Sequence, residues 1–344
     1  MRTDVGLDDA LTDDLRGVIA AALSAEYGKS AVKTIERARC AMSSSYPAEV
    51  VTVGLADGQN LRIFLKDLST RSYDAELSER RRREIAVYRD LLDGADLGTA
   101  RYYGSVEDPV RNRFWLLLEH VEGPRVEDEP FDVWVLAAVW LGRMQAYIAA
   151  HPDALNRCRR IQWLAPEYFL SMAAMAKAAA AAYGPELAER VVGALDGYAH
   201  LVANLASQPP MFVHGGYRPQ NMLRRSTGAY PRICPVDWEA AAIGPTEFDL
   251  AYLCEGFDDR RRGILVDAYR MEAARHGLRV HQDDEADVRL DACDLHKNLK
   301  TLSKAVDRHF PLAGVQKLVR MIEVAAARAL QGRTGTVSRS QSLA

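Results

Sequence analysis

The sequence predicts an α+β protein with a small β-rich N-lobe followed by a larger helical C-lobe. Two observations carry this prediction. Short alternating runs broken by turn residues fill the stretch from Val32 to Glu119, and long runs with helical period fill the chain from Phe131 onward. A chain of 344 residues can bury one large core or two smaller ones. We expect an N-terminal helix and a β-rich lobe over 1–120, a helical lobe over 121–333, and a disordered tail over 334–344.

The N-terminal elements follow from local patterns. Residues 7–27 form an acidic amphipathic helix that Gly28 ends. Strands are expected in "VKTIERARCAM" and "AEVVTVGL", with the turn cluster "SSSYP" between them. "ADGQ" is a hairpin signal, because Asp-Gly tolerates the positive φ of a tight turn. In the next strand, "NLRIFLKD", Leu61, Ile63 and Leu65 alternate with residues of the opposite face.

Further along the chain, "LSERRRREIAVYRDLLDG" has a helical period, and its Gly94 can end the helix. The run "ERRRRE" at its start is interpreted as a solvated helix surface. Two more strands are expected at 100–106 and 114–119. The C-terminal part then predicts the helices 133–150, 168–183 and 185–207, interrupted by two strand-like runs that each end in polar residues.

Composition excludes several classes of partner. The net charge of −3 argues against nucleic acid or an anionic membrane as the main partner. The expectation is that no apolar run is long enough to span a membrane, and that the acidic N-terminus lacks a signal core. Five widely spaced cysteines suit reduced thiols better than disulfides or a zinc site, so a cytoplasmic location is expected.

Lys66 lies at the end of the apolar strand "NLRIFLKD". A buried ammonium group is costly unless it finds a partner, so one interpretation is a phosphate-binding lysine held by a carboxylate of the next helix. Glu84 is the natural partner, one turn before Tyr88. The alternative is an exposed lysine whose aliphatic stem covers apolar surface. We predict that Lys66 and Glu84 form an ion pair.

Two polar positions further along predict a metal site. Asp237 ends the apolar run in "ICPVDWEAAAIGP", where an unpaired carboxylate would be costly. Mg²⁺ takes oxygen ligands and needs one or two carboxylates besides phosphate, and Asn221 can supply a second oxygen. Asn221 alone is equally compatible with a turn-stabilising amide. His214, before two glycines, is interpreted as a structural hydrogen-bonding residue rather than a base.

A resemblance now joins these residues. "HGGYRPQNML" followed by "PVDWEAAAIGPTEFDLAYL" resembles the aminoglycoside phosphotransferase and choline kinase-like family over residues 212–256. That resemblance implies the bilobal protein-kinase-like fold, with ATP and Mg²⁺ as cofactors. Residues 1–120 would then form the nucleotide-binding lobe, and 121–333 the lobe that carries the catalytic and metal loops. The resemblance also implies that Lys66 holds the ATP phosphates, that Glu84 orients Lys66, and that Asn221 and Asp237 bind Mg²⁺. Asp249 matches the family's later structural acid.

The connector "WLLLEHVEGP" runs from an apolar strand into a polar segment. Its simplest interpretation is a buried strand leaving the sheet, whatever the function. The backbone groups from Glu119 to Val121 could in addition present a hydrogen-bonding edge of the size of adenine, and both residues are predicted to contact the nucleotide.

The chain departs from the family pattern in two places. The turn Ser43–Pro47 replaces a glycine-rich phosphate loop, which affects phosphate affinity. More importantly, Gly216 stands where the family has its catalytic aspartate, so no side chain there can accept the proton of a substrate hydroxyl. The hypotheses are an ATP-dependent kinase of a small-molecule or peptide hydroxyl with an impaired or unconventional loop, a nucleotide-binding pseudokinase that serves a protein partner, and a scaffold without nucleotide.

Overall fold

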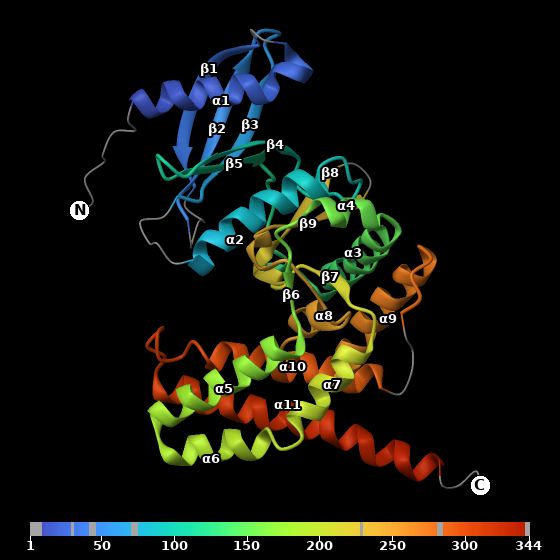
Figure 1. Ribbon diagram of the computed structural model, residues 1–344. Helices are drawn as coiled ribbons and strands as arrows, with labels where there is room; N and C mark the ends of the chain where they lie inside the picture. Colours follow the sequence, from blue (N-terminus) through green and yellow to red (C-terminus); the bar gives the residue numbers. More distant parts are fainter. Residues whose placement is uncertain are drawn as a thin grey trace. The chain divides into compact units, whose positions relative to one another are not determined.

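The computed structural model describes residues 9–28, 31–40, 46–69, 75–227, 230–280 and 285–340 (Figure 1). The described chain divides into two compact units, each discontinuous in sequence. Unit 1 comprises Met1–Pro124, Ala154–Arg160 and Leu223–Glu239, and unit 2 comprises Arg125–Asp153, Ile161–Met222 and Ala240–Ala344. A β-rich N-terminal part and a helical C-terminal part confirm the predicted α+β class. The domain limits at residues 120 and 333 stay predictions.

Unit 1 is built on one antiparallel sheet of five strands in the order β1-β2-β3-β5-β4. Its strands are β1 Val32–Arg39, β2 Ala48–Leu55, β3 Asn60–Asp67, β4 Tyr102–Asp108 and β5 Arg113–Glu119. The predicted hairpin between β2 and β3 turns at Gly58, whose φ is +86°. Along β3 the odd positions are more buried than the even ones, as the alternation predicts.

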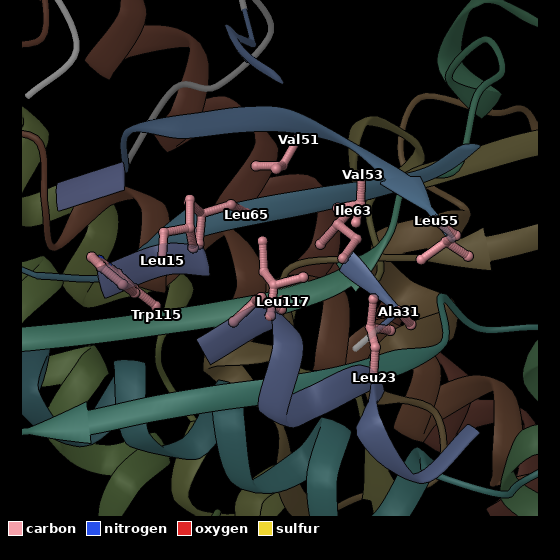
Figure 2. Close-up of a cluster of buried hydrophobic side chains, with 11 residues drawn as sticks. Leu15, Leu23, Ala31, Val51, Val53, Leu55, Ile63, Leu65, Trp115 and Leu117 are labelled. Atoms are coloured by element: carbon pink, nitrogen blue, oxygen red, sulfur yellow. The ribbon is translucent and has the colours of Figure 1, made fainter. Parts of the chain in front are cut away.

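Helix α1, Asp9–Tyr27, packs on one face of this sheet (Figure 1). Leu15, Ile19 and Leu23 of the helix belong to one buried cluster with apolar side chains of β2, β3 and β5 (Figure 2). Burying one leucine or isoleucine contributes about 1.5–3 kcal/mol, so this cluster fixes which face of β3 is covered. Leu65 lies in the cluster, and Lys66, the next residue, therefore points to the opposite face.

Helix α2, Ala75–Ala86, continues as the π-helical turn η1, Val87–Leu92. The "ERRRRE" run at its start is not simply solvated, which corrects the sequence-based interpretation. Arg81 and Arg83 are buried, and the Arg81 guanidinium lies 3.7 Å from the centre of the Phe114 ring. Unit 1 also contains most of α4, Pro152–Arg157, and of the hairpin β8, Met222–Thr227, with β9, Tyr230–Pro235.

Unit 2 is mainly helical. Its helices are α3 Phe131–Ala150, α5 Pro166–Tyr183, α6 Pro185–Ala194, α7 Tyr198–Ser207, α8 Phe248–Leu253, α9 Asp259–Arg275, α10 Ala286–Leu302 and α11 Leu312–Ser340. A small sheet in the order β6-β10-β7 joins Gln162–Trp163, Ala242–Gly244 and Met211–Val213. Short 3₁₀ turns lie at η2 Val126–Asp128, η3 Pro219–Asn221 and η4 Trp238–Ala240.

Two expectations for the helices are corrected. The single helix predicted over 185–207 is two helices, because Gly197 adopts a left-handed φ of +80° between them. Helix α3 is long and apolar enough to cross a membrane by length and composition, although no such run was expected. Its apolar window is 56% buried within the protein, as a packed core helix also is.

Some predicted features lie outside the described residues. Ser43 to Ser45 of the turn that replaces the glycine-rich loop are among them, whereas Tyr46 and Pro47 are described. Helix α11 extends to Ser340, into the stretch for which a disordered tail is predicted. Residues 341–344 are not described.

Candidate active site

Lys66 of β3 forms the centre of a charged cluster in unit 1. Its ammonium donates to both carboxylate oxygens of Glu84, at 2.8 and 2.7 Å, and to Oδ1 of Asp237 at 2.8 Å. The predicted ion pair with Glu84 is therefore confirmed. The contact with Asp237 joins residues 171 positions apart and could not be read from local patterns.

The backbone holds Asp237 in an uncommon conformation. Its φ is +71°, in the left-handed region, which costs a residue with a side chain about 1–3 kcal/mol. Hydrogen bonds hold the backbone before and after Asp237. The indole N–H of Trp238 donates to the carbonyl of Pro235, and the buried Arg83 donates to the carbonyl of Glu239 at 2.7 Å. These two contacts hold the backbone on either side of Asp237.

Burial and pairing shift the pKa values of the cluster. Burial raises the pKa of Glu84 to about 7, although the Lys66 ammonium works in the other direction. Burial also acts to lower the pKa of Lys66, but the carboxylates of Glu84 and Asp237 outweigh it and hold that pKa above its ordinary value. Lys66 is therefore a cation at neutral pH, whereas the charge of Glu84 changes with pH in that range.

Further polar side chains lie close to the Lys66 cluster. The ring of Tyr46 lies with its centre 5.5 Å from the Lys66 ammonium. Arg80 lies one helical turn before Glu84, and its guanidinium is 3.7 Å from the carboxylate of Glu239. No sequence pattern indicates this place for Tyr46, because the residue precedes β2 and has no part in the alternation of a strand or the period of a helix.

Glu119, predicted to contact the nucleotide, has its side chain committed elsewhere. Its carboxylate accepts from Arg232 at 2.9 Å and pairs with Arg225, both on the β8–β9 hairpin. Its backbone N–H donates to the carbonyl of Arg101 at 2.8 Å. The next N–H, that of His120, donates to Arg62. These two N–H groups are engaged within the protein, and the contacts of the Glu119 carbonyl and of Val121 with the nucleotide stay predictions.

The loop that carries Gly216 lies in unit 2, and hydrogen bonds to one buried carboxylate, that of Asp249, hold it in place. The carboxylate of Asp249 accepts the backbone N–H of His214 at 2.6 Å and that of Gly215 at 3.0 Å. Burial raises the pKa of Asp249 to about 7, against the effect of these two N–H groups. The structure thus gives Asp249 the anchoring role of a structural acid, and it gives His214 a buried structural position.

The two glycines of the loop differ in their surroundings. Gly215 has φ +77°, and a Cβ there would lie 1.9 Å from the carbonyl oxygen of Ala240, so only glycine fits. A Cβ on Gly216 would lie 3.9 Å from the nearest side-chain nitrogens, those of Asn221 and His214, at an ordinary contact distance. Nothing in the local backbone requires a glycine at 216.

Asn221, predicted as a metal ligand, closes the same loop. Its side-chain amide donates to the carbonyl of Gly216 at 3.1 Å. Since a carbonyl oxygen only accepts, the atom facing it must be the amide nitrogen. This contact directs the amide oxygen of Asn221 to other partners, and oxygen is the atom that a hard cation binds.

Comparison with known proteins identifies the family to which the chain belongs. The sequence profile of the phosphotransferase enzyme family matches residues 44–286. The chain belongs to that family. A search of curated protein sequences finds no match.

Solved structures of phosphotransferases share the fold. The GDP complex of aminoglycoside 2'-phosphotransferase-IIIa is 12% identical over 93% of this chain and 99% of its own, with a TM-score of 0.58. Macrolide 2'-phosphotransferase from Brachybacterium faecium is 18% identical over 94% of this chain and 98% of its own, with a TM-score of 0.55. Choline kinase from Cryptosporidium parvum is 13% identical over 96% of this chain and 97% of its own, with a TM-score of 0.52. At these identities the likeness establishes the kinase-like fold of the phosphotransferase.

One further cluster of the phosphotransferase was not foreseen. Arg218, two residues after Gly216, stacks on Tyr252 with 4.8 Å to the ring centre, and it lies 3.4 Å from the carboxylate of Glu255. Lys297 is buried between Glu255, at 3.4 Å, and Asp294, at 2.7 Å. The cluster joins the loop to α10. Only its Asp294–Lys297 pair is local, three residues apart on the helix, and sequence patterns give no signal for its other contacts.

Proposed function

We propose that this family member is a kinase-like phosphotransferase that moves the terminal phosphoryl group of ATP to an alcohol hydroxyl of a small molecule or peptide. The observation that carries the proposal is the Lys66 ammonium held between the carboxylates of Glu84 and Asp237. A fixed cation and a metal-binding acid side by side are what a transferring phosphate requires, because such catalysis rests on positioning and charge neutralisation.

The donor chemistry suits Mg²⁺. Within the described residues no group of three or more His, Cys, Asp or Glu side chains forms a cage for a metal ion. Mg²⁺ does not need one, since it usually binds one or two protein oxygens together with phosphate and water. Asp237 is the proposed carboxylate ligand and Asn221 the proposed amide ligand. When bound, the ion neutralises charge on the phosphates, and Lys66 then holds the same phosphates by hydrogen bonds.

The proposed nucleotide is ATP, with GTP as the competitor to test. GTP is included because the aminoglycoside 2'-phosphotransferase-IIIa structure compared above is a GDP complex. In this chain the backbone near Val121 is the proposed contact for the base. The backbone carbonyl of Glu119 is a second proposed contact, and the ion pairs of its side chain with Arg225 and Arg232 hold the connector in place.

The missing acid at 216 shapes the proposed chemistry. With Gly216 the loop can present the acceptor hydroxyl but cannot take its proton, so transfer is expected to be slow. The second candidate function, a nucleotide-binding pseudokinase with a protein partner, is favoured by the same observation. The loop has space for a side chain at 216 and nevertheless carries none.

Calorimetry at saturating Mg²⁺ tests the proposal. The wild type should bind ATP or GTP, and Asp237→Ala should bind it more weakly because the metal ligand is lost. Absence of binding in the wild type with either nucleotide would overturn it. Radiolabelled transfer then separates a slow enzyme from a pseudokinase. The acceptors to test are water and the compounds that the names of structurally similar proteins print, namely kanamycin, a macrolide, choline and aminopropanol.

A further inference from the structure

Arg218 is held beside position 216 by the backbone of its own loop. Its N–H donates to the carbonyl of Gly216 at 2.7 Å, and its carbonyl accepts the N–H of Asn221 at 2.8 Å. The Arg218 side chain therefore starts within the loop that, under the proposed function, presents the acceptor hydroxyl. No Asp or Glu lies between Asp196 and Asp237 in the sequence, so the loop itself contributes positive charge only.

The guanidinium of Arg218 is held on one side and can reach a ligand on the other. It lies over the buried ring of Tyr252, 4.8 Å from the ring centre, and such stacking fixes the plane of the group. An arginine side chain carries five N–H donors. Within the described residues, one hydrogen bond uses them, from Nη1 to the carboxylate of Glu255 at 3.4 Å. The side chain is 39% exposed, so a ligand can approach the group.

The carboxylate of Glu255 is shared between two cations. Lys297, whose side chain is 2% exposed, lies 3.4 Å from the other oxygen of Glu255 and 2.7 Å from Asp294. A buried ammonium depends on its carboxylates, because water cannot replace them. Arg218 is half-exposed, so it is the cation of this cluster that can exchange its protein partner for an anionic ligand.

Position 216 leaves room for such a ligand. A Cβ on Gly216 would have its nearest contacts at 3.9 Å, with side-chain nitrogens of Asn221 and His214. An aspartate at 216 would place a negative charge two residues from Arg218, and like charges repel at short range. Glycine adds neither bulk nor charge there. The loop therefore combines an accessible cation with a small, uncharged neighbouring position.

We propose that Arg218 is a specificity-determining residue that binds an anionic group of the acceptor, a carboxylate or a phosphate. The acceptor is then a hydroxy acid or a phosphate ester that carries a free hydroxyl. Arginine suits this role, because its planar donors match the oxygens of either group. This inference rests on the proposed phosphotransferase function and narrows it to one class of acceptor.

Pairs of acceptors with and without the anionic group test the proposal. Glycerate, 4-hydroxybutyrate and mandelate are each compared with their neutral amides, and glycerol 3-phosphate is compared with glycerol, in radiolabelled transfer at saturating Mg²⁺. The wild type should use the anionic member with a kcat/KM about 10- to 100-fold higher, as expected for a hydrogen bond between charged groups. Comparison of the acids with the phosphate ester distinguishes a carboxylate from a phosphate ligand.

Four variants assign the preference to Arg218. Arg218→Ala should lose it, so that both members of a pair have the same kcat/KM, and Arg218→Lys should keep part of it, since lysine has the charge but not the planar fork. Glu255→Gln should lower the KM of the anionic acceptors by about 2- to 5-fold, because a competing partner of modest strength loses its charge. Arg190→Ala is the matched control, since Arg190 pairs with Glu323 outside the loop. It should keep the full preference.

Calorimetry with ATP and GTP separates failure of this inference from failure of the proposed function. If the wild type binds nucleotide with Mg²⁺ but uses no anionic acceptor better than its neutral counterpart, the acceptor proposal is wrong and nucleotide binding stands. Absence of transfer to every acceptor counts in the same way. An equal loss with both members of each pair in a folded Arg218→Ala would also overturn it, because Arg218 would then act on the nucleotide phosphate. A wild type that binds no nucleotide refutes the function itself.

Discussion

Substituting Gly216 by aspartate tests directly whether the missing acid limits chemistry. The structure allows the change. A Cβ at 216 has its nearest contacts at 3.9 Å, with side-chain nitrogens of Asn221 and His214, and the backbone is not in the left-handed region. Replacing glycine at such a position can even stabilise a fold by about 0.4–1 kcal/mol, through the unfolded state. The fold should therefore persist with a melting temperature close to that of the wild type.

The expected gain is in the rate. A positioned general base contributes about 10²- to 10⁴-fold. Phosphoryl transfer has a loose transition state in which the acceptor's proton is lost late, so a gain of only about 10-fold is the lower bound that remains consistent with the idea. Nucleotide affinity should change little, because the added carboxylate is proposed to act on the acceptor hydroxyl and not on the nucleotide.

Single-turnover rates at saturating Mg²⁺ measure this gain, with water and with hydroxyl acceptors such as kanamycin, choline and aminopropanol. Gly216→Asn is the matched control, because it has nearly the same shape and cannot take a proton. If the aspartate variant is no faster than the asparagine variant with any acceptor, the missing acid is not the limiting factor. A wild type that already turns over at about 1–100 s⁻¹, as kinases do, would refute the reasoning from the other side.

Three further predictions concern the groups that hold the site. Asp249→Ala should lower the free energy of unfolding in denaturant titrations by about 1–3 kcal/mol for each of the two buried N–H groups left without an acceptor; an unchanged midpoint would contradict this anchoring role. Because burial raises the pKa of Glu84 to about 7, its contribution to stability is full below about pH 4.5 and is lost as the pH rises through 7. The stability of Glu84→Gln should fall less across that window than that of the wild type, since only Asp249 of the two raised carboxyl groups then titrates there, and parallel pH profiles would contradict the shift. Gly215→Ala should destabilise by more than about 1 kcal/mol, because its Cβ would meet the Ala240 carbonyl, whereas Gly216→Ala should not; equal melting temperatures would show that the loop adapts.

Local patterns predicted much of unit 1. The alternation in β3 fixed the face on which Lys66 lies, and the order of strand and helix identified Glu84 as its partner. Both inferences depend on side-chain periods of two and 3.6 residues, which a sequence shows directly. The family motif then pointed to Asp237 and Asn221, whose assignment as ligands stays a prediction.

Contacts across the chain could not be predicted in the same way. Nothing in the sequence near Glu119 shows that Arg225 and Arg232 of a distant hairpin hold its carboxylate. The "ERRRRE" run was misjudged because two of its arginines, Arg81 and Arg83, are buried against groups outside their own helix. Arg83, for example, donates to the carbonyl of Glu239. The sequence of a charged run does not show whether its side chains are exposed to solvent or buried in contacts with other parts of the chain.

The two loop glycines have different explanations. Gly215 is required by its backbone, since both its φ and the approach of the Ala240 carbonyl exclude a side chain. Gly216 satisfies no such requirement, so the fold does not explain it. Glycine also lowers stability slightly through the freedom it gives the unfolded chain. The fold thus leaves the proposed loss of a proton acceptor at 216 as the hypothesis that the Gly216→Asp measurement tests.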